Sequence, residues 1–202
     1  DEQGRSHIDK VGELVCVKPL PSMPLFLWDD PDGSRYREAY FDMFDSVWRH
    51  GDWLRIEASG VCEIFGRSDA TINRGGHRLG TSEIYDAVET LPEVFDSMAV
   101  DVRSGTESRL LLFVVPGNGA SMPDLRAAIA SVIRARLSPR FVPDDVICVA
   151  QIPRTLSMKK QELPTKRLLE GAAAADAFDF AAMVNPESVN DYVAYRDAVT
   201  TK

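Results

Sequence analysis

Between residues 81 and 169, patterns typical of helices and of strands alternate along the chain, and this alternation limits the fold more than any other feature. The periodicity predicts a helix over residues 82–91, strands over 94–102 and 110–115, a helix over 122–137, a strand over 145–149 and a helix over 162–169. A tight hairpin at Gly75-Gly76 precedes these elements. We therefore expect an α+β fold, a small domain with a three-stranded sheet and flanking helices.

Capping residues and prolines mark the ends of these helices. Thr81 can cap the helix over residues 82–91, and Pro92 ends it. Pro164 suits the first turn of the last helix.

The residues before this region predict a smaller β segment. Strands are expected over residues 12–18, 53–56 and 61–65, and a helix over 36–44. The chain opens on Asp1 rather than methionine, so we expect a piece of a longer protein. After an alanine-rich run over residues 172–176, the acidic tail is expected to pack weakly or to belong to an interface.

Charge and composition argue against several classes of function. The 202 residues carry 31 acidic and 23 basic side chains, a net charge of −8, which disfavours general nucleic-acid binding. Basic residues gather between residues 134 and 167, a distribution that suits a small anionic ligand better than a polymer. No apolar run approaches the length of a membrane span, and no secretory signal opens the chain.

The cysteines and histidines indicate no metal site. Cys16, Cys62 and Cys148 each lie in an apolar, strand-like run without CxxC spacing. We expect three reduced thiols in the core, which fits a cytoplasmic protein. The three histidines are scattered and lack the spacing of metal ligands.

A polar loop at Lys159 carries the most informative local signal. The segment Pro153-Arg-Thr-Leu-Ser-Met-Lys159 lies between a predicted strand and the last predicted helix. A positive charge on a loop anchored at both ends can approach and leave an anionic reacting centre. Alone this signal is modest, because most lysines in polar loops are only solvated.

Three segments together resemble the acyl-adenylate-forming (AMP-binding) enzyme superfamily of acyl-CoA synthetases, luciferases and peptide-synthetase adenylation domains. They are Trp48-Arg-His-Gly-Asp52, the run over residues 66–84 that begins Gly66-Arg-Ser-Asp-Ala-Thr-Ile72, and the lysine segment above. The chain looks like the C-terminal third of such an enzyme. It is most similar to the acetoacetyl-CoA synthetase family, at residues 18–24, 29–44, 162–163 and 185–187.

The resemblance implies a domain organisation and an activity. Residues 1–66 would be the β-rich end of the large N-terminal adenylation domain, residues 67–171 the mobile C-terminal domain, and residues 172–202 an extension. The activity implied is ATP-dependent ligation of a short-chain acid, acetoacetate by preference, to coenzyme A through an acyl-adenylate.

The resemblance assigns Asp52, Arg67 and Arg78 to ATP or AMP. Asp52 matches an aspartate that accepts both ribose hydroxyls, which suits an acceptor-only carboxylate. Arg67 matches an arginine whose planar fork also contacts the ribose, and Arg78 one that meets phosphate oxygens. Without the resemblance, Asp52 would be read as a turn residue and Arg67 as part of a surface ion pair.

The resemblance also implies a hinge and a CoA site. Asp69 matches the hinge about which the small domain rotates. Gly75, Gly76 and His77 match the segment beside the pantetheine arm of CoA, although a hairpin turn would equally explain the glycines. Arg134 is a candidate contact for the CoA phosphates, but a solvated charge on a helix face is the better explanation.

Lys159 matches the catalytic lysine of the superfamily. Its charge would stabilise the transition state in which a carboxylate attacks the α-phosphorus of ATP. Lys160 is a neighbour that could be confused with it, and the motif register favours Lys159. The family usually has glycine where this chain has Met158; if that position needs a positive φ, methionine costs about 1 kcal/mol and should reduce adenylation.

Parts of the family's machinery have no counterpart in this sequence. The Ser/Thr/Gly-rich phosphate loop, the acyl pocket and the glutamate expected to hold Mg²⁺ would belong to the missing N-terminal domain. ATP, CoA and Mg²⁺ are therefore implied for the complete acid–thiol ligase, and this chain alone should not catalyse the full reaction. Two alternatives stay open: another short-chain acyl-CoA synthetase, or a catalytically inactive fragment that acts as a nucleotide- or CoA-binding module.

Overall fold

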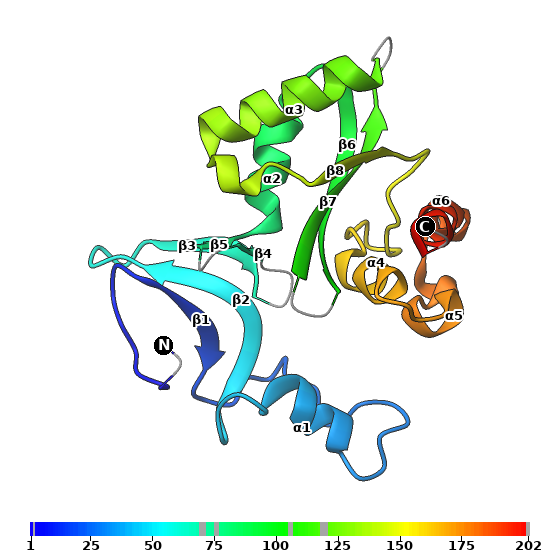
Figure 1. Ribbon diagram of the computed structural model, residues 1–202. Coiled ribbons are helices and arrows are strands. Elements are labelled where there is room, and N and C mark those ends of the chain that lie inside the picture. The colour runs from blue at the N-terminus through cyan, green and yellow to red at the C-terminus, as the bar shows by residue number, and fades with distance from the viewer. Residues whose placement is uncertain (2, 69–71, 75–76, 105–106, 118–120, 201–202) are drawn as a thin grey trace. The chain divides into compact units, whose positions relative to one another are not determined.

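The chain divides into two compact units, Asp1–Asp69 and Ala70–Lys202. The computed structural model (Figure 1) describes residues 1, 3–68, 72–74, 77–104, 107–117 and 121–200. For residues 73, 77, 78, 104, 107 and 200 it describes the backbone alone.

The first unit contains a three-stranded antiparallel sheet in the order β1-β2-β3. Its elements are β1 (Val11–Cys16), α1 (Ser34–Tyr40), β2 (Trp48–Ile56) and β3 (Cys62–Arg67). Tyr40 stacks on Trp48 with ring centroids 3.8 Å apart, and Tyr36 and Phe41 meet the same indole at steep angles. This aromatic cluster attaches α1 to β2. The helix is shorter than predicted because it ends at Tyr40, after which Phe41 leaves helical geometry at φ −130°.

The second unit follows the predicted order of elements. A hairpin of β4 (Ile72–Arg74) and β5 (His77–Leu79) precedes α2 (Thr81–Val88), β6 (Val94–Ser104), β7 (Glu107–Pro116), α3 (Met122–Arg136), the 3-10 helix η1 (Pro139–Phe141), β8 (Asp145–Cys148) and α4 (Glu162–Leu169). Strands β6 and β7 pair antiparallel, and β7 and β8 pair parallel, in the sheet order β6-β7-β8. The predicted α+β fold with a three-stranded sheet is confirmed.

The central strand β7 is buried on both faces. Leu110, Leu112 and Val114 pack in a core with α2 and α3, whereas Leu111 and Phe113 pack in a second core with α4 and the C-terminal helices. Figure 1 shows α2 and α3 on one side of this sheet and α4 to α6 on the other. Burial on both faces explains why this strand is a continuous apolar run rather than an alternating pattern.

The predicted cap of the first helix in this unit is wrong. Gly80, not Thr81, is the N-cap residue of α2, and its N–H donates to the Glu83 carboxylate at 3.2 Å. The Thr81 hydroxyl instead donates to Glu162 at 3.0 Å. The hydroxyl that the local pattern assigned to the helix cap is thus bound to a residue 81 positions later in the chain.

The expectation of a weakly packed tail is also wrong. The tail forms α5 (Ala174–Ala177), the 3-10 helices η2 (Phe180–Ala182) and η3 (Pro186–Ser188), and α6 (Val189–Thr200). Tyr192 is fully buried, and its ring centroid lies 4.5 Å from that of Phe113. Phe178 and Met183 belong to the same core. The tail therefore completes one face of the sheet.

The cysteines are free, but they do not lie in the core as expected. Cys16 is half-buried, and Cys62 and Cys148 are exposed. Cys148 shares the face of Val146 on β8, but it is the last residue of this edge strand and therefore lies at the border of the sheet, where its side chain stays exposed. Within the described residues, no helix combines the length and apolar character that crossing a membrane requires.

We expect Tyr192→Ala to lower the free energy of unfolding by about 3 kcal/mol or more, because it leaves a large cavity beside Phe113. Val199→Ala, at an exposed position of the same helix, should change it by less than about 0.5 kcal/mol. All three tryptophans lie in the first unit, so urea unfolding is best followed by circular dichroism. Equal, small effects of both substitutions would show that the tail is not part of the core.

Candidate functional site

A closed turn presents Lys159. Arg154 and Lys160 pair as an antiparallel bridge at the base of this turn. Inside it, the Thr155 N–H donates to the Lys159 carbonyl at 3.0 Å, and the Lys159 N–H donates to Thr155 Oγ1 at 3.1 Å. The Lys159 side chain is exposed, and no hydrogen bond or ion pair to its ammonium group occurs within the described part of the chain. The turn is therefore ordered while its cation stays available.

Met158 lies in the left-handed region of backbone conformation, at φ 67°. The residue before Lys159 thus adopts a positive φ, which glycine adopts readily. The family usually has glycine at this position. The methionine side chain is 56% exposed, so little burial offsets a cost of about 1 kcal/mol.

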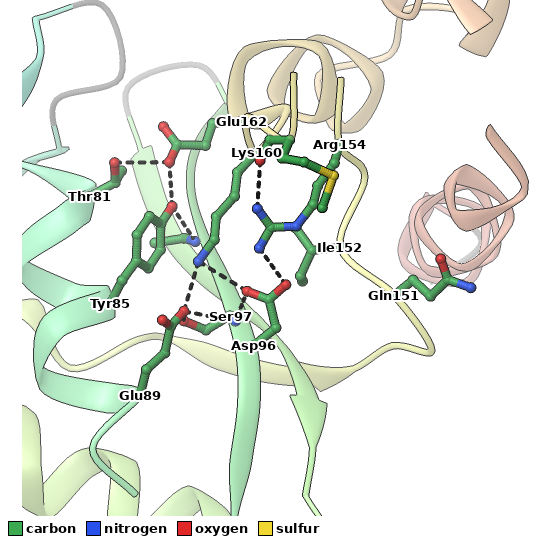
Figure 2. Close-up of polar contacts among 12 residues, drawn as sticks. Thr81, Tyr85, Glu89, Asp96, Ser97, Gln151, Ile152, Arg154, Lys160 and Glu162 are labelled. Carbon is green, nitrogen blue, oxygen red and sulfur yellow. Dashed lines mark hydrogen bonds and ion pairs between the residues drawn. The ribbon is translucent and has the colours of Figure 1, made fainter. Parts of the chain in front are cut away.

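Lys160 is held by two carboxylates. Its Nζ lies 2.7 Å from Glu89 Oε1 and 3.1 Å from Asp96 Oδ1, and 3.8 Å above the centroid of the Tyr85 ring. Only 15% of its side chain is exposed. Figure 2 shows these groups converging on Lys160 from α2 and β6. Lys160 is therefore bound to the interior of the unit, and Lys159 is the exposed one of the two lysines.

Asp96 also binds the other stem of the turn. Arg154 Nη2 donates to Asp96 Oδ2 at 2.6 Å, and Arg154 Nη1 donates to the Met158 carbonyl at 2.7 Å. Burial raises the pKa of Asp96. The hydrogen bond from Arg154 and the charge of Lys160 together lower this pKa by more than burial raises it, so it lies below its ordinary value. Asp96 is consequently a carboxylate at neutral pH.

A neutral phenol completes this cluster. The Tyr85 hydroxyl donates to Glu162 Oε1 at 2.5 Å and accepts from the Ala99 N–H at 3.1 Å. Burial raises the pKa of Tyr85 well above its ordinary value, and the Glu162 charge raises it further. Tyr85, Glu89 and Asp96 were not predicted from the sequence. The local signal was the spacing of four residues between Tyr85 on α2 and Glu89 at its C-cap, which places the two on one side of the helix.

In the first unit, the structure brings Asp52 and Arg67 together. They are cross-strand partners of β2 and β3. Gly51, beside them, has φ +87°, and a Cβ atom there would lie only 2.9 Å from Arg67 Nη2. The positive φ favours glycine here, and a Cβ atom would in addition displace the end of the Arg67 side chain. His50 Nδ1 makes a short contact with Asp52 Oδ2, a partner that the sequence analysis did not assign.

The remaining predicted residues are only partly described. Asp69, Gly75 and Gly76 lie outside the described residues, and of His77 and Arg78 only the backbone, in β5, is described. Their assigned roles stay predictions. The division between the two units follows Asp69.

Arg134 is exposed on α3. The structure does not bring it into contact with the turn at Lys159, which fits a solvated charge on a helix face. In the described ranges, no group of three or more His, Cys, Asp or Glu side chains is placed to hold a metal ion.

Residues 83–159 match the family described as the AMP-binding enzyme C-terminal domain. This match confirms the resemblance to the AMP-binding enzymes that was drawn from the motifs of the chain.

Acetoacetyl-CoA synthetases are among its relatives. The chain is 45% identical over 193 residues to an acetoacetyl-CoA synthetase of Caenorhabditis elegans, covering 93% of this chain and 27% of the relative. It is 41% identical over 191 residues to an acetoacetyl-coenzyme A synthetase of Rhizobium meliloti (strain 1021), covering 94% of this chain and 29% of the relative. It thus spans less than a third of the length of these relatives and corresponds to their C-terminal part.

A solved structure shares both fold and sequence with this chain. The acetoacetyl-CoA synthetase from Streptomyces lividans superposes with a TM-score of 0.88 at 44% identity, covering 98% of this chain and 30% of that one.

The positive φ of Met158 predicts which of two substitutions gives the more stable protein. We expect Met158→Gly to be more stable than Met158→Ala by about 1 kcal/mol, because only glycine adopts a positive φ without steric cost. The alanine variant is the matched control, since it removes the exposed side chain but keeps a Cβ atom. Urea unfolding of both variants measures the difference, and a more stable alanine variant would contradict a left-handed residue here.

Proposed function

We propose that this chain is the C-terminal portion of an ATP-dependent acid–CoA ligase, in which Lys159 stabilises the transition state of acyl-adenylate formation. The observation that carries the proposal is the contrast between two adjacent lysines. Lys159 is exposed on an ordered turn, whereas Lys160 is bound by Glu89 and Asp96.

The chemistry suits a cation that does not transfer a proton. A substrate carboxylate attacks the α-phosphorus of ATP and pyrophosphate leaves, so two anions meet and charge develops between them. The ammonium group of an exposed lysine can stabilise that charge without transferring a proton. The CoA thiol then displaces AMP from the acyl-adenylate to give the thioester. Mg²⁺ would share the neutralisation of phosphate charge, with its ligands in the remainder of the enzyme.

For the nucleotide, we propose that Asp52 and Arg67 bind the ribose. The cross-strand pairing of these residues supports this role, because it sets an acceptor-only carboxylate beside a donor-only guanidinium. Arg78 is proposed for the phosphates, and Gly75, Gly76 and His77 for the approach of CoA. Asp69 is proposed as the hinge, which the division of the chain into two units directly after this residue supports.

We propose acetoacetate as the acid, on the names of relatives that are 38–45% identical to this chain. Another short-chain acid is the alternative, since the residues expected to form the acyl pocket belong to the remainder of the enzyme. A cytoplasmic location is proposed as well, and the free thiols support it.

A second candidate function is a catalytically inactive module that binds a nucleotide or CoA. The left-handed Met158 favours it, because strain beside Lys159 would displace the cation from its working position.

In the full-length protein, we expect Lys159→Ala to slow pyrophosphate release from ATP and acid by on the order of 10²- to 10³-fold, the effect of removing one group that stabilises developing charge. Thioester formation from preformed acyl-adenylate and CoA should change little. Lys166→Ala is the matched control, a lysine on α4 that pairs only weakly with Glu170 at 3.9 Å. Unchanged pyrophosphate release in Lys159→Ala would refute the role of Lys159, whereas the absence of pyrophosphate release from the unmodified full-length protein would favour the inactive module.

Among short acids offered to the full-length protein, we expect acetoacetate to support the fastest AMP release. The measurement is AMP formed with ATP and CoA across a panel of acids that includes acetate, propionate and butyrate. A faster reaction with any of these would replace acetoacetate, without affecting the role of Lys159.

A further inference from the structure

One carboxylate joins both stems of the turn that presents Lys159. Asp96 Oδ2 accepts a hydrogen bond from Arg154 at 2.6 Å, and Asp96 Oδ1 lies 3.1 Å from Lys160 Nζ. Arg154 and Lys160 are the two residues that pair across the base of the turn. Figure 2 shows the contacts of Arg154 and Lys160 meeting at the Asp96 carboxylate. One acidic side chain of β6 therefore contacts both residues at the base of the turn.

A bulge in β6 lies directly before Asp96. The register of β6 with β7 shifts between Val94 and Asp96, which leaves Phe95 as the extra residue of a bulge, with 81% of it exposed. A bulge bends its strand and redirects the side chains next to it, and bulges are frequent near active sites. The bulge therefore helps to set the direction in which the Asp96 side chain leaves the sheet.

A short series of contacts links Asp96 to Lys159. The guanidinium group of Arg154 uses one nitrogen for Asp96 and the other for the carbonyl of Met158, at 2.7 Å. That carbonyl belongs to the peptide group that leads into Lys159. The planar fork of arginine fixes the angle between its two hydrogen bonds, so the orientation of Asp96 is passed to the backbone at Lys159.

From this geometry we propose that Asp96 is a positioning residue for Lys159. The inference rests on the proposed role of Lys159 in acyl-adenylate formation. Asp96 acts on that reaction only through the turn, by fixing where the Lys159 ammonium group lies. A misplacement of about 1 Å can cost on the order of 10²-fold in rate, so a fixed turn base matters for catalysis even if the fold survives without it.

The turn has other attachments that keep it folded. The Leu156 N–H donates to the Ala182 carbonyl at 2.9 Å, and the Val184 N–H donates to the Arg154 carbonyl at 3.2 Å. Glu89 also binds Lys160. Removing the Asp96 charge should therefore leave the turn in place but release its orientation.

The test uses the full-length protein with Asp96→Asn, which keeps the shape of the side chain and removes its charge. We expect pyrophosphate release to fall by on the order of 10- to 100-fold, the cost of a displaced catalytic group. Thioester formation from preformed acyl-adenylate and CoA should stay within about twofold, because the proposed role of Lys159 is confined to adenylation. Equal losses in both half-reactions would show a merely structural role and overturn the proposal.

A double-mutant cycle separates positioning from independent effects. If Asp96 acts through Lys159, the double variant Asp96→Asn/Lys159→Ala should release pyrophosphate no more slowly than Lys159→Ala alone. Multiplied losses would overturn the proposal. Normal pyrophosphate release in Lys159→Ala would refute the proposed function itself, whereas a slow Lys159→Ala with a normal Asp96→Asn would refute positioning alone.

The matched control is Asp145→Asn, which breaks an aspartate–arginine pair of similar length in the same unit, 2.7 Å to Arg126. It should leave both half-reactions unchanged. Should Asp96→Asn fail to fold, Arg154→Lys keeps the positive charge but loses the two-pronged fork. The same selective loss of pyrophosphate release is expected from that variant, and its absence would overturn the proposal.

Discussion

The carboxylate of Asp96 binds the two cations that flank Lys159, and the shape of the turn depends on that interaction. Within the turn, the left-handed Met158 opposes the observed conformation by about 1 kcal/mol. Hydrogen bonds to charged groups contribute about 1.5–3 kcal/mol each, and the Asp96 and Arg154 side chains are only 14% and 22% exposed. The contacts to β6 are therefore strong enough to hold a turn that its own sequence disfavours.

Two lysines adjacent in the chain reach opposite environments. Successive side chains of an extended segment point to opposite sides, so Lys160 turns toward the sheet while Lys159 faces solvent. Burying the Lys160 ammonium group without partners would cost free energy, but Glu89 and Asp96 supply compensating negative charge and the Tyr85 ring lies beneath the ammonium group. The phenol stays neutral, because burial and Glu162 raise the pKa of Tyr85. Pairing of one lysine thus leaves a single cation exposed at the turn.

Much of the fold could be predicted from sequence, and the partners of the turn could not. The apolar run over residues 110–115 identified the central strand, because burial on both faces requires one. Asp96, by contrast, looks like any acidic residue beside a strand, and its partner Arg154 lies 58 residues later. The tail was misjudged because the residue that buries Tyr192 is the distant Phe113. Local sequence patterns predict helices and strands. Which polar side chains hold the fold together depends on contacts between residues that lie far apart in the sequence.

A cation carried by a unit that pivots has to be rigid within that unit. Fixing the backbone costs about 1–2 kcal/mol per residue, so a disordered loop over residues 155–159 would have to be ordered again each time Lys159 met its substrate. The bridge between Arg154 and Lys160 and the contacts of Asp96 have already met that cost during folding. Only the Lys159 side chain then remains to be ordered, at no more than about 2 kcal/mol. Under the proposed function, the unit would rotate about Asp69 as a rigid body. The attachment of the turn to β6 would then let that rotation carry the Lys159 ammonium group with it.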